Sequence, residues 1–252
     1  MKKIVSLFLS LLLVVTLLPS VKVSADDISG IVLEKEMRAM VDQGIIKGYE
    51  NGKYAPFENV SRGQFATFIA RALSLSESTH RFTDVPVTSN LAAGINAAAE
   101  AGIVNGYSGG KFGPHDLVTR EQMAIMIEKA MDYMMLAKTK GSLNFTDAAT
   151  LTSSVSRNAI AYSVGLGIIS GFPDGNSFAF KPKKNATRAE AAAFIYRLLE
   201  AQKKQEEEMT PDPGDETGKP YSVGRLDSAG NVTKIKSFAT YDEALKSLTS
   251  AS

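Results

Sequence analysis

The sequence of 252 residues contains no cysteine and no tryptophan, and its only histidines are His80 and His115. Without cysteine, the chain has neither a disulfide framework nor a thiolate nucleophile. Two histidines give little basis for a zinc site, and no set of serine, histidine and acid recurs along the chain. We therefore predict no catalytic residues, no metal site and no cofactor.

The sequence also has few long apolar runs. The longest extends from Ile4 to Leu18. It is shorter than the roughly 20 residues that span a bilayer. Lys2 and Lys3 precede it, and the small residues Val23-Ser24-Ala25 follow. This pattern is typical of a secretory signal peptide, which we place at residues 1–25. An uncleaved anchor is the alternative, and we expect no membrane span in the mature chain.

The charges of the chain nearly balance, with 28 basic and 27 acidic residues. The expected signal peptide holds three of the lysines, so the mature chain has 25 basic residues against the same 27 acidic ones. A slightly acidic chain without a basic excess is not typical of a nucleic-acid binder. We therefore expect no nucleic-acid partner. A secreted chain without disulfides favours a bacterial exterior.

One phrase occurs three times, and each copy is followed by a hydroxyl residue and an arginine. The copies are Gly44-Ile-Ile-Lys-Gly48-Tyr49, Gly102-Ile-Val-Asn-Gly106-Tyr107 and Gly167-Ile-Ile-Ser-Gly171-Phe172, and the pairs are Ser61-Arg62, Thr119-Arg120 and Thr187-Arg188. Such a triplication indicates repeated supersecondary units. We place unit one at residues 26–80, unit two at 81–142 and unit three at 143–204.

Each unit is predicted to contain two helices joined by a turn-rich loop. The first helix ends at the first glycine of the phrase, since glycine readily adopts the left-handed conformation. The second begins at a capping box, in which Ser61 pairs with Gln64, Thr119 with Gln122, and Thr187 with Glu190. We expect an all-α fold of three helix-loop-helix repeats in a pseudo-threefold, three-pronged arrangement. An open stack like a solenoid is the alternative.

The composition changes after Glu200, where charged residues give way to proline, glycine, aspartate and threonine. We expect a flexible linker at 205–220. Residues 221–252 suggest the start of a truncated C-terminal domain, a small fragment of α/β type. It has two strand-like runs around Ala229-Gly230-Asn231 and a helix that Thr240 caps together with Glu243.

Arg62, Arg120 and Arg188 occupy the first helical position, where the macrodipole disfavours a positive charge. The repeated placement suggests that each guanidinium faces an anion. Asp26 and Asp84 stand 18 residues before the first glycine of their units, and Asp147 stands 20 before its own. Two interpretations remain open. The aspartates clamp arginines of adjacent units, or each arginine lies in a groove with helix amides and binds an anionic sugar.

The residues that close the phrase also allow two interpretations. The second glycines, Gly48, Gly106 and Gly171, either admit a ligand to the backbone or permit tight packing between helix and loop. The aromatic residues that follow them either offer a face to a sugar ring or belong to the core, and we favour the core. These residues are Tyr49, Tyr107 and Phe172.

The repeated phrases resemble those of the S-layer homology domain, over roughly residues 26–200. The resemblance is carried by Phe82-Thr-Asp-Val, Gly102-Ile-Val-Asn-Gly-Tyr, Val118-Thr-Arg-Glu-Gln and Thr187-Arg188-Ala189-Glu190. It implies non-covalent attachment to the bacterial cell wall or S-layer through an anionic secondary wall polysaccharide, typically a pyruvylated one. The motif arginines would contact ketal carboxylates, and Asp26, Asp84 and Asp147 would bind sugar hydroxyls. Backbone contacts would come from Gly44, Gly48, Gly102, Gly106, Gly167 and Gly171.

The chain departs from the family in lacking tryptophan near the start of the first helices, and unit three has three extra residues before Thr187. We therefore expect fewer than three competent grooves and rank the one around Arg120 first. Two other functions remain open, namely the wall-targeting part of a surface enzyme and a self-associating surface protein. The sequence leaves the oligomeric state open.

Overall fold

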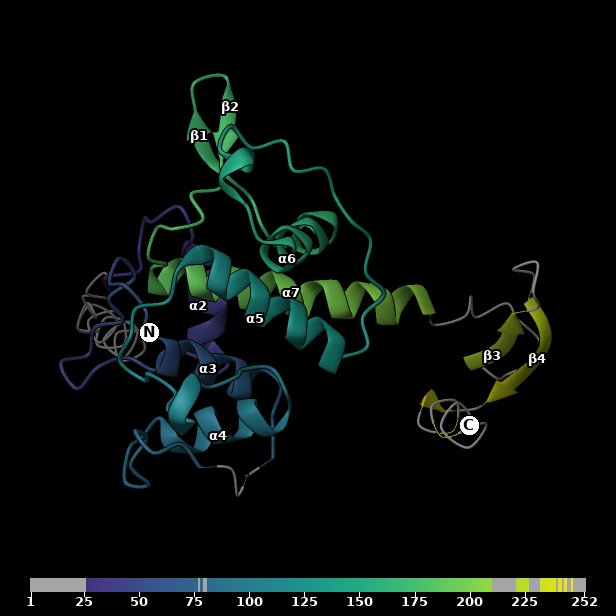
Figure 1. Cartoon of the computed structure of the whole chain (residues 1–252), viewed down its shortest axis with the longest axis horizontal. Helices are drawn as coiled ribbons and strands as arrows, with labels where there is room; N and C mark the ends of the chain where they lie inside the picture. Colours follow the sequence, from purple (N-terminus) through teal and green to yellow (C-terminus); the bar gives the residue numbers. More distant parts are fainter. Residues whose placement is uncertain are drawn as a thin grey trace, which may run out of the picture.

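The computed structural model describes residues 26–76, 78, 81–209, 221–226, 232–238, 240, 241, 243 and 246. The expected signal peptide and residues 210–220 of the expected linker lie outside them. Within the described residues the fold is mostly helical (Figure 1). Unit one contains α2 (Glu34–Asp42) and α3 (Arg62–Ala72), unit two α4 (Ala92–Glu100) and α5 (Arg120–Tyr133), and unit three α6 (Ser154–Gly165) and α7 (Arg188–Met209). Short 3-10 turns lie at Ser108–Gly110 and Ala148–Thr150.

The predicted starts of the second helices and the predicted ends of the first helices are confirmed. In unit two, Thr119 Oγ1 accepts from the Gln122 amide at 3.3 Å and Gln122 Oε1 accepts from the Thr119 amide at 2.9 Å. The same reciprocal bonds cap α3 and α7. The first glycines Gly44, Gly102 and Gly167 have φ of 70°, 70° and 69°, as expected of residues that end a helix.

The main helix pairings lie between units rather than within them. The second helix of each unit packs on the first helix of the next: α3 on α4, α5 on α6, and α7 on α2. In Figure 1, α7 runs lengthwise through the group of helices. Its contact with α2 joins unit three to unit one, so the contacts form a closed cycle. One continuous core contains Met37, Ile95, Met123 and Ile160, all fully buried.

A ring of three backbone hydrogen bonds joins the loops just before the second helices. Val60 donates to Ala186 at 2.9 Å, Ala186 to Val118 at 2.9 Å, and Val118 to Val60 at 3.1 Å. All three residues are completely buried. Each unit therefore donates one of these hydrogen bonds and accepts another, so all three units take part equally in the ring.

A β-hairpin in unit three departs from the predicted all-α fold. Strand β1 (Phe172–Asp174) pairs antiparallel with β2 (Ser177–Ala179), with Phe172 opposite Ala179. The hairpin projects from the helices at the top of Figure 1. Asp174 and Gly175 begin the turn between the two strands. The three extra residues before Thr187 lie here, because all three loops match without gaps from Ala179 onward.

Helix α7 continues to Met209, so the predicted start of the linker at residue 205 was wrong. The Gln205 side chain stabilises this extension, because it accepts from the Ala137 amide at 2.9 Å and donates to the Ala137 carbonyl at 2.8 Å. Strands β3 (Tyr221–Leu226) and β4 (Val232–Phe238) form the predicted C-terminal pair. Thr240 accepts from the Glu243 amide, as expected for the cap.

The ring of hydrogen bonds predicts the order of hydrogen exchange. The amides of Val60, Val118 and Ala186 should exchange at the slowest rates in the protein and only through global unfolding, because each is buried and bonded to another unit. Native-state exchange measured at increasing denaturant tests this. If one of the three amides exchanged through a local opening that is insensitive to denaturant, the units would open separately, contrary to this prediction.

Candidate ligand-binding site at the unit junctions

The motif arginines lie at three junctions, each formed by the start of a second helix and the loop of another unit. Junction 1/2 joins Arg62 to loop 111–118, junction 2/3 joins Arg120 to loop 179–186, and junction 3/1 joins Arg188 to loop 53–60. The three junctions thus follow the same cycle as the helix contacts.

The motif arginines are buried, with relative exposures of 6% for Arg62, 3% for Arg120 and 2% for Arg188. Their Nε and Nη2 atoms donate to main-chain carbonyls of the next unit. The Nε bonds reach Phe112 at 3.3 Å, Phe180 at 2.8 Å and Tyr54 at 2.7 Å, and the Nη2 bonds reach Asn105 at 3.1 Å, Ser170 at 3.2 Å and Lys47 at 2.9 Å. Each arginine therefore holds the loop and the phrase of its neighbour together.

The expected pairing of these arginines with aspartates is not what the structure has. In the described part of the chain, only Arg120 of the three pairs with a carboxylate, that of Glu190 at 3.3 Å from Nη1. Burial lowers the pKa of Arg120, and the Glu190 carboxylate acts in the opposite direction. Burial also lowers the pKa of Arg188. The sequence suggested that acidic side chains would compensate the charge of these arginines. In the structure, the dipoles of main-chain carbonyls compensate most of it.

The helix amides expected in a groove are occupied as well. At junction 3/1 the Arg188 amide donates to Glu58 at 2.9 Å and the Ala189 amide to Pro56 at 3.0 Å. Loop carbonyls take the first two amides of α3 and α5 in the same way. Because the capping hydroxyl takes the third, the first turn keeps no amide for an external anion.

Two of the predicted aspartates organise the loops. Asp84 accepts from the Phe112 amide at 2.7 Å and the Gly113 amide at 2.8 Å. Asp147 accepts in the same way from Phe180 and Lys181. Burial raises the pKa of Asp84, but the backbone hydrogen bonds and the charge of Lys111 together outweigh burial, so its pKa is lowered overall. These carboxylates fix the loop whose carbonyls the arginine contacts.

Asp27, rather than the predicted Asp26, has this position in unit one. Asp27 accepts from the Tyr54 amide at 3.0 Å and the Ala55 amide at 2.7 Å. Asp26 instead pairs with Arg38 at 3.0 Å, and this hydrogen bond lowers its pKa to about 2. The equal spacing of 18 residues was misleading, because the segment before α2 is one residue shorter than the segment before α4.

The second glycines are explained by packing. A Cβ on Gly106 would lie 2.6 Å from both the Lys111 carbonyl oxygen and the Phe82 ring, and one on Gly171 would lie 2.8 Å from Phe178. Around Gly48 the nearest atom is the Lys53 carbonyl oxygen at 3.2 Å. The protein itself therefore fills the space that the sequence left open to a ligand.

The aromatic residues after these glycines cover the arginines. Tyr49 lies over Arg188 and Tyr107 over Arg62, each with 4.8 Å from the guanidinium carbon to the ring centre. Phe172 lies over Arg120 at 4.5 Å. Tyr49 is 40% exposed and Tyr107 47%, so our preference for the core was wrong for these two. Each junction thus has a cation beneath a ring, an arrangement that stabilises the cation.

Junction 2/3 differs from the others in the charge of its loop. Unit three has Lys181-Pro182-Lys183-Lys184 where unit one has Ala55-Pro56-Phe57-Glu58 and unit two has Gly113-Pro114-His115-Asp116. The ammonium groups of Lys181 and Lys184 lie 5.2 and 4.9 Å from the centre of the Phe172 ring. We did not single out these lysines from the sequence, although the gapless match of the loops contains the signal.

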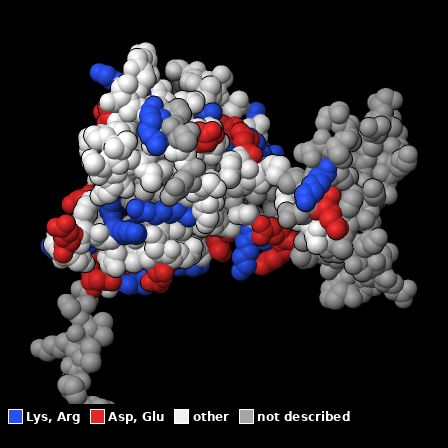
Figure 2. All heavy atoms as spheres, turned by 90° about the horizontal axis from the view of Figure 1, so that it is seen from below, with Lys and Arg blue, Asp and Glu red and all other residues white. Residues whose placement is uncertain are grey.

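On the face in Figure 2, basic and acidic side chains are interspersed and much of the surface has neither. Among the described residues, no three histidine, cysteine or acidic side chains group to hold a metal ion. No helix in that part of the chain is both long and apolar enough to cross a membrane.

The chain belongs to the S-layer homology domain family. The family matches residues 26–66, 81–124 and 144–192, one segment in each predicted unit. The three matched segments contain the motif arginines and the start of each second helix. The resemblance expected from the repeated phrases is confirmed.

Similar proteins include an amylopullulanase of Thermoanaerobacterium thermosulfurigenes, 37% identical over 170 residues, or 65% of this chain and 9% of that protein. A surface-layer 125 kDa protein of Lysinibacillus sphaericus is 30% identical over 69% of this chain and 14% of its own length. A cellulosome-anchoring protein of Acetivibrio thermocellus is 29% identical over 62% of this chain and 35% of its own length. The chain thus spans only a small part of these relatives. The names of the last two agree with the expected location in the cell wall or S-layer.

The buried arginines predict a stability effect. Arg188→Met should lower the free energy of unfolding by roughly 2–4 kcal/mol, because two charged hydrogen bonds are lost and two carbonyls are left without donors. Urea unfolding measures this. Arg157→Met is the control, since Arg157 also donates to carbonyls but is exposed. A loss at Arg188 no larger than at Arg157 would contradict the proposed structural role.

The lowered pKa of Asp84 predicts a pH dependence. Because its folded-state pKa lies below the unfolded value of about 3.9, its stabilisation is present above that pH and is lost as the pH falls. The difference in unfolding free energy between the unmodified protein and Asp84→Asn should therefore shrink from pH 7 to pH 3. Urea titrations at several pH values test this. A difference independent of pH would show that the charge of Asp84 is not responsible.

Proposed function

We propose that this chain anchors a secreted protein to the bacterial cell wall, without a covalent bond, by binding an anionic secondary wall polysaccharide at its unit junctions. The observation that supports this most is the recurrence, in a chain of this family, of a guanidinium beneath an aromatic ring at all three junctions. The resemblance to the family suggests a pyruvylated polymer, whose ketal carboxylates supply the negative charge.

In this proposal each motif arginine lies beneath an aromatic ring, and the ligand binds on the opposite side of that ring. Their Nε and Nη2 donors are used within the protein, as described above. In the described part of the chain Nη1 of Arg62 and Nη1 of Arg188 have no hydrogen-bond partner, whereas Nη1 of Arg120 bonds to Glu190. Arg62 and Arg188 therefore keep both N–H groups of Nη1 for a carboxylate. Asp84 and Asp147 act as positioning residues, as does Asp27 in place of Asp26.

The half-exposed rings Tyr49 and Tyr107 are suited to the apolar face of a sugar. One side of each ring covers the arginine of its junction. A sugar on the other side would shield the ring from water and continue the stack of cation, ring and carbohydrate. The protein fills the space beside the second glycines, and the amides of Gly44, Gly102 and Gly167 donate within the protein. Backbone contacts to a ligand would therefore come from the carbonyl groups of these three exposed residues.

Junction 2/3 remains our first choice for an anion, now for a different reason. Arg120, Lys181 and Lys184 surround the Phe172 ring, and Glu190 neutralises only part of their charge. Lys181 forms no ion pair with another described residue, and its side chain is exposed. Three neighbouring cations repel one another, so a bound carboxylate would relieve the repulsion. The corresponding loops at the other junctions have Glu58 and Asp116 instead.

We also propose that the closed cycle of contacts reflects a pseudo-threefold arrangement of units one to three. Equivalent helix pairings, arginine contacts and loop hydrogen bonds at each junction support it. An open stack would not bring α7 onto α2. Such an arrangement gives the polymer three related surfaces that differ in charge.

The region with the three units has no catalytic role in this proposal. A second function, the wall-targeting part of a surface enzyme, is favoured by one observation: the chain matches 9% of an amylopullulanase and 16% of an exoglucanase of Acetivibrio thermocellus. In that case residues 221–252 would open the domain that the anchor carries. Both functions place the same binding surface at the junctions.

Sedimentation with cell walls tests the proposal. The mature protein should sediment with purified wall sacculi and stay in solution with sacculi from which the secondary polymer has been extracted. Equal sedimentation with both preparations would rule out the proposed ligand. Lys181→Glu should weaken binding roughly fivefold, the equivalent of about 1 kcal/mol. Lys203→Glu makes the same charge change on the exposed part of α7 and should bind like the unmodified protein.

A further inference from the structure

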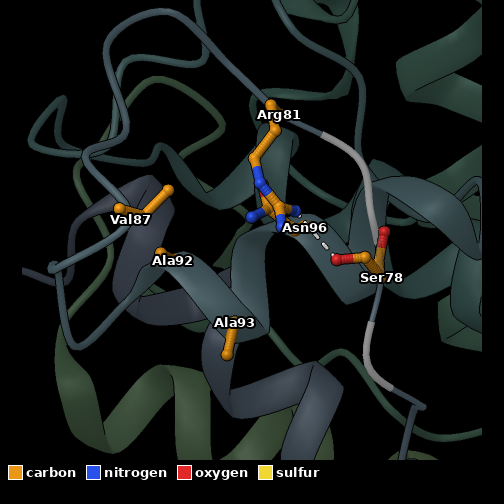
Figure 3. A pocket seen from close by; sticks show the side chains of 6 residues that line it. All are labelled: Ser78, Arg81, Val87, Ala92, Ala93 and Asn96. Carbon is orange, nitrogen blue, oxygen red and sulfur yellow. Dashed lines mark hydrogen bonds between the residues drawn. The ribbon is translucent and has the colours of Figure 1, made fainter.

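A small hollow lies beside α4, and none of the motif arginines lines it (Figure 3). Its volume is about 190 Å³, and it is lined by Ser78, Arg81, Val87, Ala92, Ala93 and Asn96. In Figure 3 the ends of Arg81 and Asn96 lie together, and Val87, Ala92 and Ala93 lie to one side of them. The hollow thus combines a polar end with an apolar wall.

Asn96 is the unusual member of this lining. It is 5% exposed, and its Oδ1 has no hydrogen-bond partner. Among the described residues only Ser163 Oγ shares this condition. Leaving a buried amide unpaired costs about 1–3 kcal/mol, so such a group requires an explanation.

The fold does not explain Asn96, because the other units have different residues six positions before the first glycine. Unit one has Arg38, which pairs with Asp26, and unit three has Ala161. A buried apolar side chain is therefore compatible with this position. Asn96 lines a hollow that is large enough for a small molecule, and a bound donor would satisfy its unpaired Oδ1.

Arg81 supplies the opposite chemistry at the same end of the hollow. Its Nη1 donates to the Ser78 carbonyl at 2.8 Å, and a guanidinium has N–H donors and no acceptor. Ala92 and Ala93 present methyl groups beside it. A ligand that fits must donate to Asn96, accept from Arg81 and bring a small apolar group to the alanines.

We propose that this hollow binds the acetamido group of an N-acetylated sugar. The N–H of that group donates to Asn96 Oδ1, its carbonyl accepts from the Arg81 guanidinium, and its methyl packs on Ala92 and Ala93. A sugar hydroxyl lacks the methyl group, and a carboxylate has no hydrogen to give to Oδ1. The site is separate from the junctions, and the inference does not rest on polymer binding there.

Nuclear magnetic resonance of the ¹⁵N-labelled mature protein tests the proposal, with N-acetylglucosamine as the probe. The amides of Ala92 and Ala93 should shift with N-acetylglucosamine and not with equal concentrations of glucose or acetate. No shift with N-acetylglucosamine, or an equal shift with either of the other two probes, would overturn the proposal.

Two variants assign the binding to the hollow. Asn96→Leu should weaken it at least about tenfold and should keep or raise the melting temperature, because an unpaired polar group is removed. Ala93→Leu, at an exposed position, should abolish binding by filling the hollow. Asn158→Leu on the exposed face of α6 is the control. Binding that survives both Asn96→Leu and Ala93→Leu would refute the site.

The shifts of the Ala92 and Ala93 amides also show whether the acetamido group comes from peptidoglycan or from the secondary polymer. Glycan fragments of peptidoglycan freed of secondary polymer form one arm, and purified secondary polymer forms the other. Lys181→Glu should leave the shifts of Ala92 and Ala93 unchanged with N-acetylglucosamine. The acetamido site can therefore fail while junction binding holds, and the reverse, so the two proposals are tested separately.

Discussion

The contact between a buried arginine and the carbonyls of a neighbouring loop is the interaction on which this structure depends. Arg188 shows it most fully, since its side chain bonds Tyr54 and Lys47 while its amide bonds Glu58. A positive side chain at a positive helix end is unfavourable in isolation. Here the loop turns several carbonyl oxygens toward that end, and their partial negative charges compensate both. The same contact recurs at the other two junctions, so local sequence alone does not stabilise the start of any second helix.

Much of the fold could be predicted from short-range patterns. The capping boxes, the glycines that end the first helices and the buried faces are local features, and the structure has them where the sequence indicated. The β1–β2 hairpin was missed because three-residue strands leave almost no periodicity. The extent of α7 was missed because the bond between Gln205 and Ala137 joins residues that are distant in sequence.

The candidate site was harder to predict, since residue type identifies a charge but not its partner. Arg62, Arg120 and Arg188 were correctly singled out as anomalous, yet the anion inferred for them proved to be mostly main-chain carbonyl. Asp26 was chosen over Asp27 because equal spacing from the glycine was taken as equivalence. The segment before α2 is one residue shorter than the segment before α4, so equal spacing does not identify equivalent residues. The gapless match of the loops was the better guide, because it depends on a segment of constant length.

The ring formed by Val60, Val118 and Ala186 also constrains how such a protein can change in evolution. In a linear array, a repeat can be duplicated or deleted at moderate cost because the remaining neighbours simply close up. Here each donor already has its acceptor in a different repeat, so a fourth copy would find no vacancy and a missing copy would expose two broken bonds. The ring of bonds therefore favours three copies. Segments outside the ring can vary more freely, as the hairpin of the third repeat illustrates.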